Sequence, residues 1–305
     1  MVMFDLAVVG HLCIDYISIN GSKPRRALGG PPTYTSLAAK ALGLKTAIIS
    51  KVGEDFPKEY LSFLAEKGVN LSWLKIIKGA ESTKFLLEYY CGERKLKLLG
   101  LAPKIMEEDV PRNVKFSASH VSPVAGEIGF RAIRKLRSQS RIMTLDAQGF
   151  VRSFNNHGYV NLVPWCDFRI LGLVDVFKAS LEEIRLIAAS KSLEDTIKHI
   201  HGLGVKVVIV TMGSNGSLIS NTDNGAYFIP TYKQVNVVDS TGAGDAYMAG
   251  FLQAYIRGEN IAWCGCMGAS TSSFILENFG PSKFGSLKEV YNRAEKLYAL
   301  VEKVF

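Results

Sequence analysis

Short apolar runs alternate with segments of helical periodicity along most of the chain. The apolar runs have the length and composition of buried strands and occupy residues 4–10, 46–50, 142–146, 174–178 and 205–211. Helical patterns, the first two followed by a glycine stop signal, occupy residues 32–42, 57–67 and 242–257. The alternation predicts an α/β fold with a mostly parallel sheet and helices on both faces.

Two segments depart from this rhythm by alternating apolar and polar residues, at about 14–28 and 83–99. The pattern indicates antiparallel strands outside the main sheet, with a hairpin turn at Cys91, Gly92 and Glu93, although ordinary edge strands would give the same pattern. Paired with each other, the two insertions would form a small sheet able to cover a site. Because no linker or repeat interrupts the chain, we expect one domain over residues 1–305 that carries this lid.

Composition excludes some classes of protein. The net charge is +8, but lysines and arginines are scattered and the densest runs, at 23–26 and 131–141, are short. A solvated basic surface therefore fits better than a nucleic-acid footprint, and it would also suit a polyanionic substrate. The five cysteines include no zinc-binding pattern. We expect a cytoplasmic protein with reduced thiols and no membrane partner, because the first strand lacks a signal-peptide pattern and no apolar run reaches spanning length.

The stretch VVDSTGAGDAYMAGFL, residues 237–252, carries the candidate chemistry. Gly242, Ala243 and Gly244 leave the start of a helix without bulky side chains, so its unpaired N–H groups can bind an anion. Asp245 falls in the first turn. Alone it would be only a favourable charge at a helix start, but that does not explain the bare turn. An anion hole beside a base is what phosphoryl transfer to a hydroxyl needs.

Other phosphate-binding signatures are absent from the sequence. No Gly-Lys-Ser/Thr motif occurs, and the glycines at 242 and 244 lack the third glycine of the dinucleotide fingerprint. A second turn of small residues, 211–216, follows an apolar strand. It is compatible with a site for nucleotide phosphates and equally with a simple tight turn.

The motif DSTGAGD at 239–245 resembles the C-terminal signature of the ribokinase-like (PfkB-type) carbohydrate kinases. Gly29 and Gly30, the helix at 32–42 and the segment 52–55 resemble their N-terminal signature, and the likeness runs through nearly the whole chain. It implies a three-layer α/β/α sandwich with a mostly parallel central sheet and a small antiparallel β lid. It also implies that the cofactors are ATP and Mg²⁺.

The resemblance also assigns roles. Asp245 would be the base, and Gly242, Ala243 and Gly244 would hold the moving phosphoryl group. The nucleotide phosphates would meet Ser180, Thr211, Gly213 and Gly216. Glu183 would organise Mg²⁺ through water, but Ser180 stands where the family usually has asparagine. Whether a monovalent cation binds near Asp239 stays open, as does a homodimer formed through the lid.

Substrate-side residues follow from the same resemblance. Asp15 would grip substrate hydroxyls and Gly30 would let the substrate approach the backbone, while Tyr34 replaces the asparagine of sugar kinases. Segments 124–127, 146–148, 178–180 and 280–284 are similar to the inositol kinase branch, which adds Asp146 and Gln148 to the expected wall, although both fit an ordinary strand-end turn. We therefore expect an ATP-dependent myo-inositol kinase. The alternatives are a ribose, sugar-acid or nucleoside kinase, for which Tyr34 offers an aromatic floor, and a non-catalytic sugar or nucleotide sensor.

Overall fold

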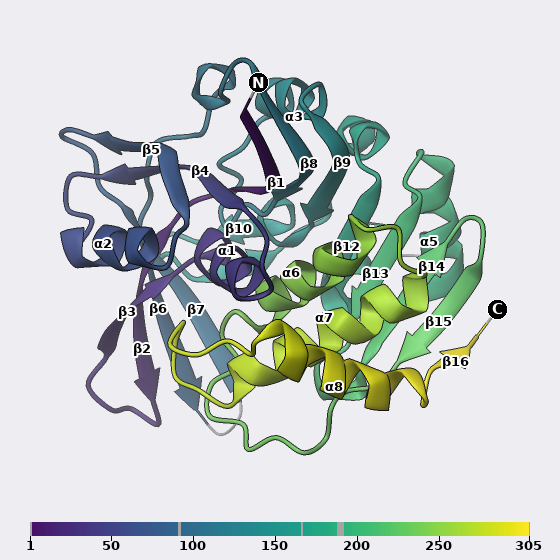
Figure 1. Cartoon of the computed structure of the whole chain (residues 1–305). Helices are drawn as coiled ribbons and strands as arrows, with labels where there is room; N and C mark the ends of the chain where they lie inside the picture. Colours follow the sequence, from purple (N-terminus) through teal and green to yellow (C-terminus); the bar gives the residue numbers. More distant parts are fainter. Residues whose placement is uncertain (1, 91–92, 166, 188–191, 305) are drawn as a thin grey trace.

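The computed structural model describes residues 2–90, 93–165, 167–187 and 192–304. Within these residues a ten-stranded sheet forms the centre of the molecule, in the order β16-β15-β14-β13-β12-β9-β8-β1-β4-β5 (Figure 1). Seven strands run parallel: β1 Val2–Val9, β4 Thr46–Gly53, β5 Asn70–Ile77, β8 Val114–Val121, β9 Ser140–Asp146, β12 Val176–Ser180 and β13 Val207–Thr211. One edge is antiparallel: β14 Ser217–Asn221, β15 Gly225–Ile229 and β16 Glu302–Lys303.

Alternate residues of the strands enter two separate cores, which explains why the strands are continuously apolar. In β1, Leu6 and Val8 pack in one core, whereas Ala7 and Val9 pack in the other. The first core lies under α1 Pro31–Ala41, α6 Ala243–Tyr255, α7 Ile261–Leu276 and α8 Leu287–Tyr298. The second lies under α3 Phe130–Arg137, α4 Leu181–Ile184 and α5 Leu193–Gly202. Helix α2, Lys58–Glu66, packs beside β4 and β5. The predicted three-layer sandwich is confirmed.

A separate four-stranded sheet forms the lid, at lower left in Figure 1. It contains β2 Cys13–Ile19, β3 Arg25–Gly29, β6 Thr83–Tyr90 and β7 Glu93–Gly100, in the order β3-β2-β6-β7. The two insertions thus pair with each other. Each is an antiparallel pair, and β2 joins β6 in parallel. The turn expected at Cys91 and Gly92 lies outside the described residues.

A short hairpin beside the lid was not predicted from the sequence. It consists of β10 Arg152–Phe154 and β11 Val160–Leu162. The hairpin leaves the main body after β9 and touches lid strand β7, where the N–H of Leu98 donates to the carbonyl of Gly158 at 2.8 Å.

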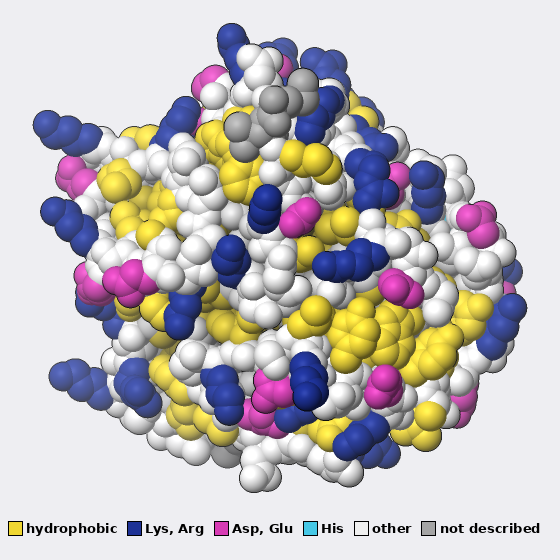
Figure 2. Space-filling model, in the orientation of Figure 1, with side chains coloured by type: hydrophobic (Ala, Val, Ile, Leu, Met, Phe, Trp, Pro, Cys, Tyr) yellow, Lys and Arg dark blue, Asp and Glu magenta, His cyan; other side chains and the backbone are white. Residues whose placement is uncertain are grey.

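The surface agrees with the charge pattern of the sequence. On the face drawn in Figure 2, Lys and Arg side chains are scattered among acidic and apolar ones and do not gather in one patch. In the described part of the chain, no helix combines the length and apolar character needed to cross a bilayer.

Candidate active site

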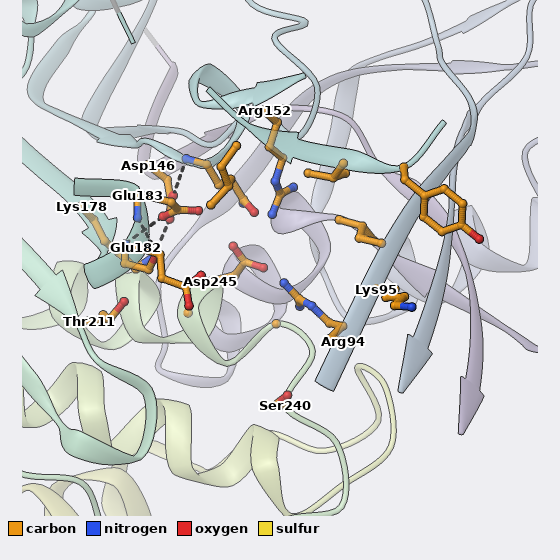
Figure 3. A pocket seen from close by; sticks show the side chains of 18 residues that line it. Arg94, Lys95, Asp146, Arg152, Lys178, Glu182, Glu183, Thr211, Ser240 and Asp245 are labelled. Carbon is orange, nitrogen blue, oxygen red and sulfur yellow. Dashed lines mark hydrogen bonds and ion pairs between the residues drawn. The ribbon is translucent and has the colours of Figure 1, made fainter. Parts of the chain in front are cut away.

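A cavity of about 850 Å³ opens where the parallel strands β9, β12 and β13 end, beside the lid (Figure 3). This is the usual place for a ligand in an open α/β sheet. Lid strand β7, the β10–β11 hairpin, the strand ends and the start of α6 all contribute to its walls. The lining residues are Arg94, Lys95, Leu96, Asp146, Gln148, Arg152, Tyr159, Val160, Leu162, Lys178, Ser180, Glu182, Glu183, Thr211, Ser240, Gly242, Gly244 and Asp245.

The start of α6 is held by its preceding loop. One carboxylate oxygen of Asp239 accepts the N–H of Thr241 at 2.9 Å, and the other accepts the N–H of Gly280 at 3.2 Å. Gly242 caps the helix with φ of 79°. A Cβ there would lie 2.2 Å from the ring of Tyr34. Both the backbone conformation and the packing therefore require glycine at this position.

The first turn of α6 presents free N–H groups. Within the described residues, the N–H groups of Gly244 and Asp245 make no hydrogen bond, whereas that of Ala243 donates to the carbonyl of Ser240 at 3.3 Å. Gly242 and Gly244 line the cavity. Free N–H groups and the positive end of the helix dipole favour an anion at this position.

Asp245 stands beside this turn and faces the cavity. Burial, helped by the nearby carboxylate of Asp146, raises the pKa of Asp245 to about 7, although Lys178 opposes the shift. The hydroxyl of Thr35 on α1 donates to the backbone carbonyl of Asp245 at 3.1 Å, which fixes the turn. A carboxylate with a pKa near neutrality is suited to accept a proton from a hydroxyl.

Lys178 and Asp146 form a buried ion pair in the cavity wall made by the ends of β9, β12 and β13; we call this part of the cavity the donor side. The ammonium nitrogen of Lys178 lies 2.5 Å from Oδ2 of Asp146, and both side chains are almost fully buried. Burial alone would lower the pKa of Lys178, but Asp146 raises it, so the lysine stays charged. The ammonium would also lie 3.3 Å from a Cβ on Gly244, so it faces the same turn. Sequence reasoning gave Lys178 no role.

Ser180 and Glu183 occupy the end of β12. The Ser180 hydroxyl accepts the N–H of Glu183 at 3.2 Å, and Oε2 of Glu183 accepts the N–H of Ser180 at 2.8 Å. This reciprocal cap starts α4. Both residues line the cavity, as does Glu182. The serine that replaces the family's asparagine therefore has a structural use as a helix cap.

The small-residue turn after β13 reaches the site only at its first residue. Thr211 lines the cavity, whereas Gly213 and Gly216 are not among the lining residues. They belong to a tight turn around the 3₁₀ helix Gly213–Asn215, closed by the N–H of Met212 donating to the carbonyl of Gly216 at 2.8 Å. Residues 212–216 therefore do not line the cavity.

A second pocket lies under the lid and shares six lining residues with the cavity, Asp245 among them; we call it the acceptor pocket. Its lining residues are Cys13, Asp15, Gly30, Pro31, Tyr34, Phe85, Leu87, Arg94, Leu96, Val124, Gln148, Arg152, Thr241, Gly242 and Asp245. Three predicted substrate residues, Asp15, Gly30 and Tyr34, thus meet Gln148 here. Asp146 does not line this pocket, because it turns to Lys178 on the donor side.

Asp15 and Tyr34 bring unpaired polar groups into the acceptor pocket. Asp15 is 5% exposed, and its carboxylate makes no hydrogen bond or ion pair within the described residues. Burial raises the pKa of Asp15 to about 7, although the nearby charge of Arg94 opposes the shift, and the carboxylates of Asp239 and Asp245 add to it. The Tyr34 hydroxyl is buried without a hydrogen-bond partner. Buried groups left unpaired in a pocket point to a polar ligand.

Two arginines that the sequence analysis missed also line both pockets. Arg94 extends from lid strand β7, and Arg152 extends from the unpredicted hairpin (Figure 3). The sequence around these arginines does not reveal that they face the site, because their position depends on how the lid and the hairpin pack.

A bare helix start beside a carboxylate of raised pKa, at the strand ends of a parallel sheet, defines a phosphotransferase that acts on a hydroxyl. The model of the pfkB family of carbohydrate kinases matches residues 3–109 and 163–286, and the chain belongs to this family. The resemblance inferred from the motifs is thereby confirmed. The chain is a sugar or nucleoside kinase in the broad sense of that family.

Relatives cover nearly the whole chain. It is 26% identical to a cytidine kinase of Thermococcus kodakarensis over 91% of this chain and 98% of that protein. It is 27% identical to a nucleoside kinase of Methanocaldococcus jannaschii, over 96% of this chain and 98% of that protein. Among solved structures, a pyrophosphate-dependent kinase of the ribokinase family, complexed with a pyrophosphate analogue and myo-inositol, is similar with a TM-score of 0.81. That structure is 23% identical, and the match covers 94% of this chain and 99% of the other.

Proposed function

We propose that the chain is an ATP-dependent nucleoside kinase. The observation that carries this proposal is the mixed lining of the acceptor pocket. It combines polar groups, among them the unpaired carboxylate of Asp15, with the apolar side chains of Phe85, Leu87 and Val124, and Phe85 is the register partner of Asp15 in the lid sheet. A nucleoside has the same mixture, because its ribose presents hydroxyls and its base presents a flat face.

A cyclic hexol would place some of its hydroxyls against the apolar part of this lining. Myo-inositol carries a hydroxyl on every carbon, and those facing Phe85 and Leu87 would lose water without gaining a partner. Asp146, one of the residues expected to bind the substrate, does not line the acceptor pocket, and its carboxylate is paired with Lys178. The names of the cytidine and nucleoside kinase relatives support the same preference.

Phosphoryl transfer follows from the arrangement of charges. Asp245 takes the proton of the acceptor hydroxyl as that oxygen forms a bond to the γ-phosphorus of ATP. The bond from that phosphorus to the ADP oxygen breaks, and ADP leaves with the electron pair. The N–H groups of the first turn of α6 and the ammonium of Lys178 stabilise the charge on the phosphoryl oxygens.

A divalent cation fits the donor side. In the described residues no three His, Cys, Asp or Glu side chains gather to hold a metal directly. Mg²⁺ commonly keeps several waters and binds through one or two carboxylates and substrate phosphates. Glu183 and Glu182, both in the cavity wall, are the carboxylates that would hold it. When bound, the ion would neutralise the phosphates of the donor.

Myo-inositol is a second candidate acceptor because Asp15 and Gln148 offer hydrogen bonds from two elements of the acceptor pocket. The myo-inositol complex among the similar structures supports keeping it. The same structure makes pyrophosphate an alternative donor, which the cationic groups of the cavity would also suit.

The apolar wall provides the test of the acceptor. We expect Phe85→Ser to raise the KM of cytidine at least tenfold and to leave that of ribose nearly unchanged, since only the base would meet the wall. Leu86→Ser is the matched control, because the next residue of β6 faces the other side of the lid sheet and is not among the lining residues. Equal changes in both KM values, or better use of myo-inositol than of cytidine by the wild type, would refute the nucleoside proposal.

A further inference from the structure

The side chains of Arg94 and Arg152 have few direct partners in the protein, although both lie near enough to the carboxylate of Asp245 to oppose its raised pKa. Within the described residues the Arg94 side chain makes no hydrogen bond or ion pair, and the Arg152 side chain makes one long hydrogen bond, to the carbonyl of Val124 at 3.4 Å. Both arginines line the cavity and the acceptor pocket. Figure 3 shows their guanidinium groups pointing into the space in front of Asp245 from two different elements.

We propose that Arg94 and Arg152 form a clamp on the phosphoryl group while it passes from donor to acceptor, and that docking of the β10–β11 hairpin on the lid assembles this clamp. The proposal rests on the kinase reaction above but not on the identity of the acceptor. The boundary between the two pockets is where the moving phosphoryl group must lie. A guanidinium presents paired N–H donors whose geometry matches phosphoryl oxygens.

The positive groups already described, Lys178 and the N–H groups of α6, leave the lid side of the phosphoryl group without a partner for its negative charge. The ammonium of Lys178 is bound to Asp146, and the N–H groups of α6 approach the phosphoryl group from one side only. Arg94 and Arg152 approach from the lid side. In a transfer with a loose transition state, charge spreads over three equatorial oxygens, and donors on more than one side stabilise it.

A contact between the lid and the hairpin fixes the positions of the two arginines relative to each other; we call this contact the clasp. It consists of the hydrogen bond from Leu98 to Gly158 and a bridge between Lys97 and Tyr159, with the Lys97 ammonium 5.3 Å from the centre of the Tyr159 ring. Arg94 lies on the same strand as Leu98. Arg152 begins the hairpin that carries Gly158 and Tyr159. Docking one element on the other therefore places both guanidinium groups.

Gly158 is the residue that permits the clasp. Its φ is 82°, and a Cβ at this position would lie 2.5 Å from the carbonyl oxygen of Leu98. Any side chain there would push the hairpin from the lid strand. Gly158 is outside the cavity lining, so it is a positioning residue.

The clamp is tested by steady-state kinetics of arginine variants, using whichever acceptor and donor the wild type uses best. We expect Arg94→Ala to lower kcat by about 10²–10³-fold, the usual cost of one preorganised donor, with the acceptor KM changed less than threefold. Arg152→Ala should behave similarly. Added guanidinium at a non-denaturing concentration should restore part of the kcat of Arg94→Ala, and Arg94→Lys should retain part of it.

Arg26→Ala is the control for lid charge, because Arg26 lies on lid strand β3 and pairs on the surface with Glu59. Its kcat should stay within about twofold of the wild type. A raised acceptor KM with unchanged kcat in Arg94→Ala would show that the arginine binds the acceptor instead, and would overturn the clamp. The absence of guanidinium rescue in a variant that melts like the wild type would also overturn it.

The clasp is tested by Gly158→Val, which replaces no residue that lines the cavity. We expect kcat to fall at least tenfold with the donor KM nearly unchanged, and guanidinium not to restore it. An unchanged kcat would refute the part of the proposal that concerns the hairpin.

Discussion

Replacing Asp15 by asparagine should stabilise the free enzyme while weakening its hold on the acceptor. Asp15 is 5% exposed, has no partner in the described residues, and has a pKa raised by burial from 3.8 to about 7. The folded protein therefore binds this proton more tightly than the unfolded chain. Stability falls as the pH rises from about 4 to 7, and above pH 7 the full penalty applies.

The magnitude follows from that pKa difference. About three pKa units correspond to at most about 4 kcal/mol of destabilisation at pH 8. In a chain of this size, 4 kcal/mol corresponds to roughly 6 °C in Tm. Asp15→Asn removes the charge and should raise Tm by several degrees at pH 8 and hardly at all near pH 4. The same change should raise the acceptor KM by about 10–10³-fold, since hydrogen bonds to a charged group contribute ~1.5–3 kcal/mol each.

Scanning calorimetry at the two pH values measures the effect on stability, and Asp109→Asn provides the control. Asp109 is also 5% exposed, but it is paired with Lys51 at 2.6 Å and with Lys75 at 2.7 Å. Those lysines lower the pKa of Asp109 despite its burial, so its replacement should lower Tm at pH 8. The reasoning is refuted if both variants lose stability at pH 8, or if Asp15→Asn changes the KM of donor and acceptor equally.

Three further predictions concern the start of α6 and its base. Asp245→Asn should lower kcat by about 10²–10⁴-fold with donor binding retained; a loss below threefold in a turnover assay would contradict its role as base. In wild-type enzyme, kcat/KM for the acceptor should rise with pH up to about 7, where Asp245 and Asp15 lose their protons; a flat profile from pH 5 to 8 would count against both assignments. Gly242→Ala should lose several degrees in Tm because its Cβ meets the Tyr34 ring, whereas Gly244→Ala should fold normally; equal melting temperatures would contradict this packing.

The strands of the sheet and the start of α6 could be predicted because their causes are local. Parallel strands buried on both faces are continuously apolar, as Leu6 to Val9 illustrate. The helix at 242–257 corresponds to α6, Ala243–Tyr255. Its bare first turn beside Asp245 is visible in the sequence because glycines and carboxylate are neighbours along the chain.

Features that depend on long-range packing could not be predicted in the same way. Nothing near Asp146 in the sequence reveals that Lys178, 32 residues later, pairs with it across β9 and β12. Arg152 lies in a hairpin of three-residue strands, too short to give a periodic pattern. The approach of Arg94 to the same space depends on the docking of that hairpin on the lid.

The ratio of kcat/KM for cytidine to that for myo-inositol, measured with ATP and Mg²⁺, tests the central claim most directly. The apolar wall at Phe85 and Leu87 and the unpaired carboxylate of Asp15 predict a ratio above ten, because a well-matched site strongly rejects an acceptor that leaves its groups unpaired. A ratio below one-tenth would contradict the nucleoside assignment and make myo-inositol the acceptor. Transfer to neither acceptor, nor to any other nucleoside, would contradict the account of the acceptor pocket as a whole.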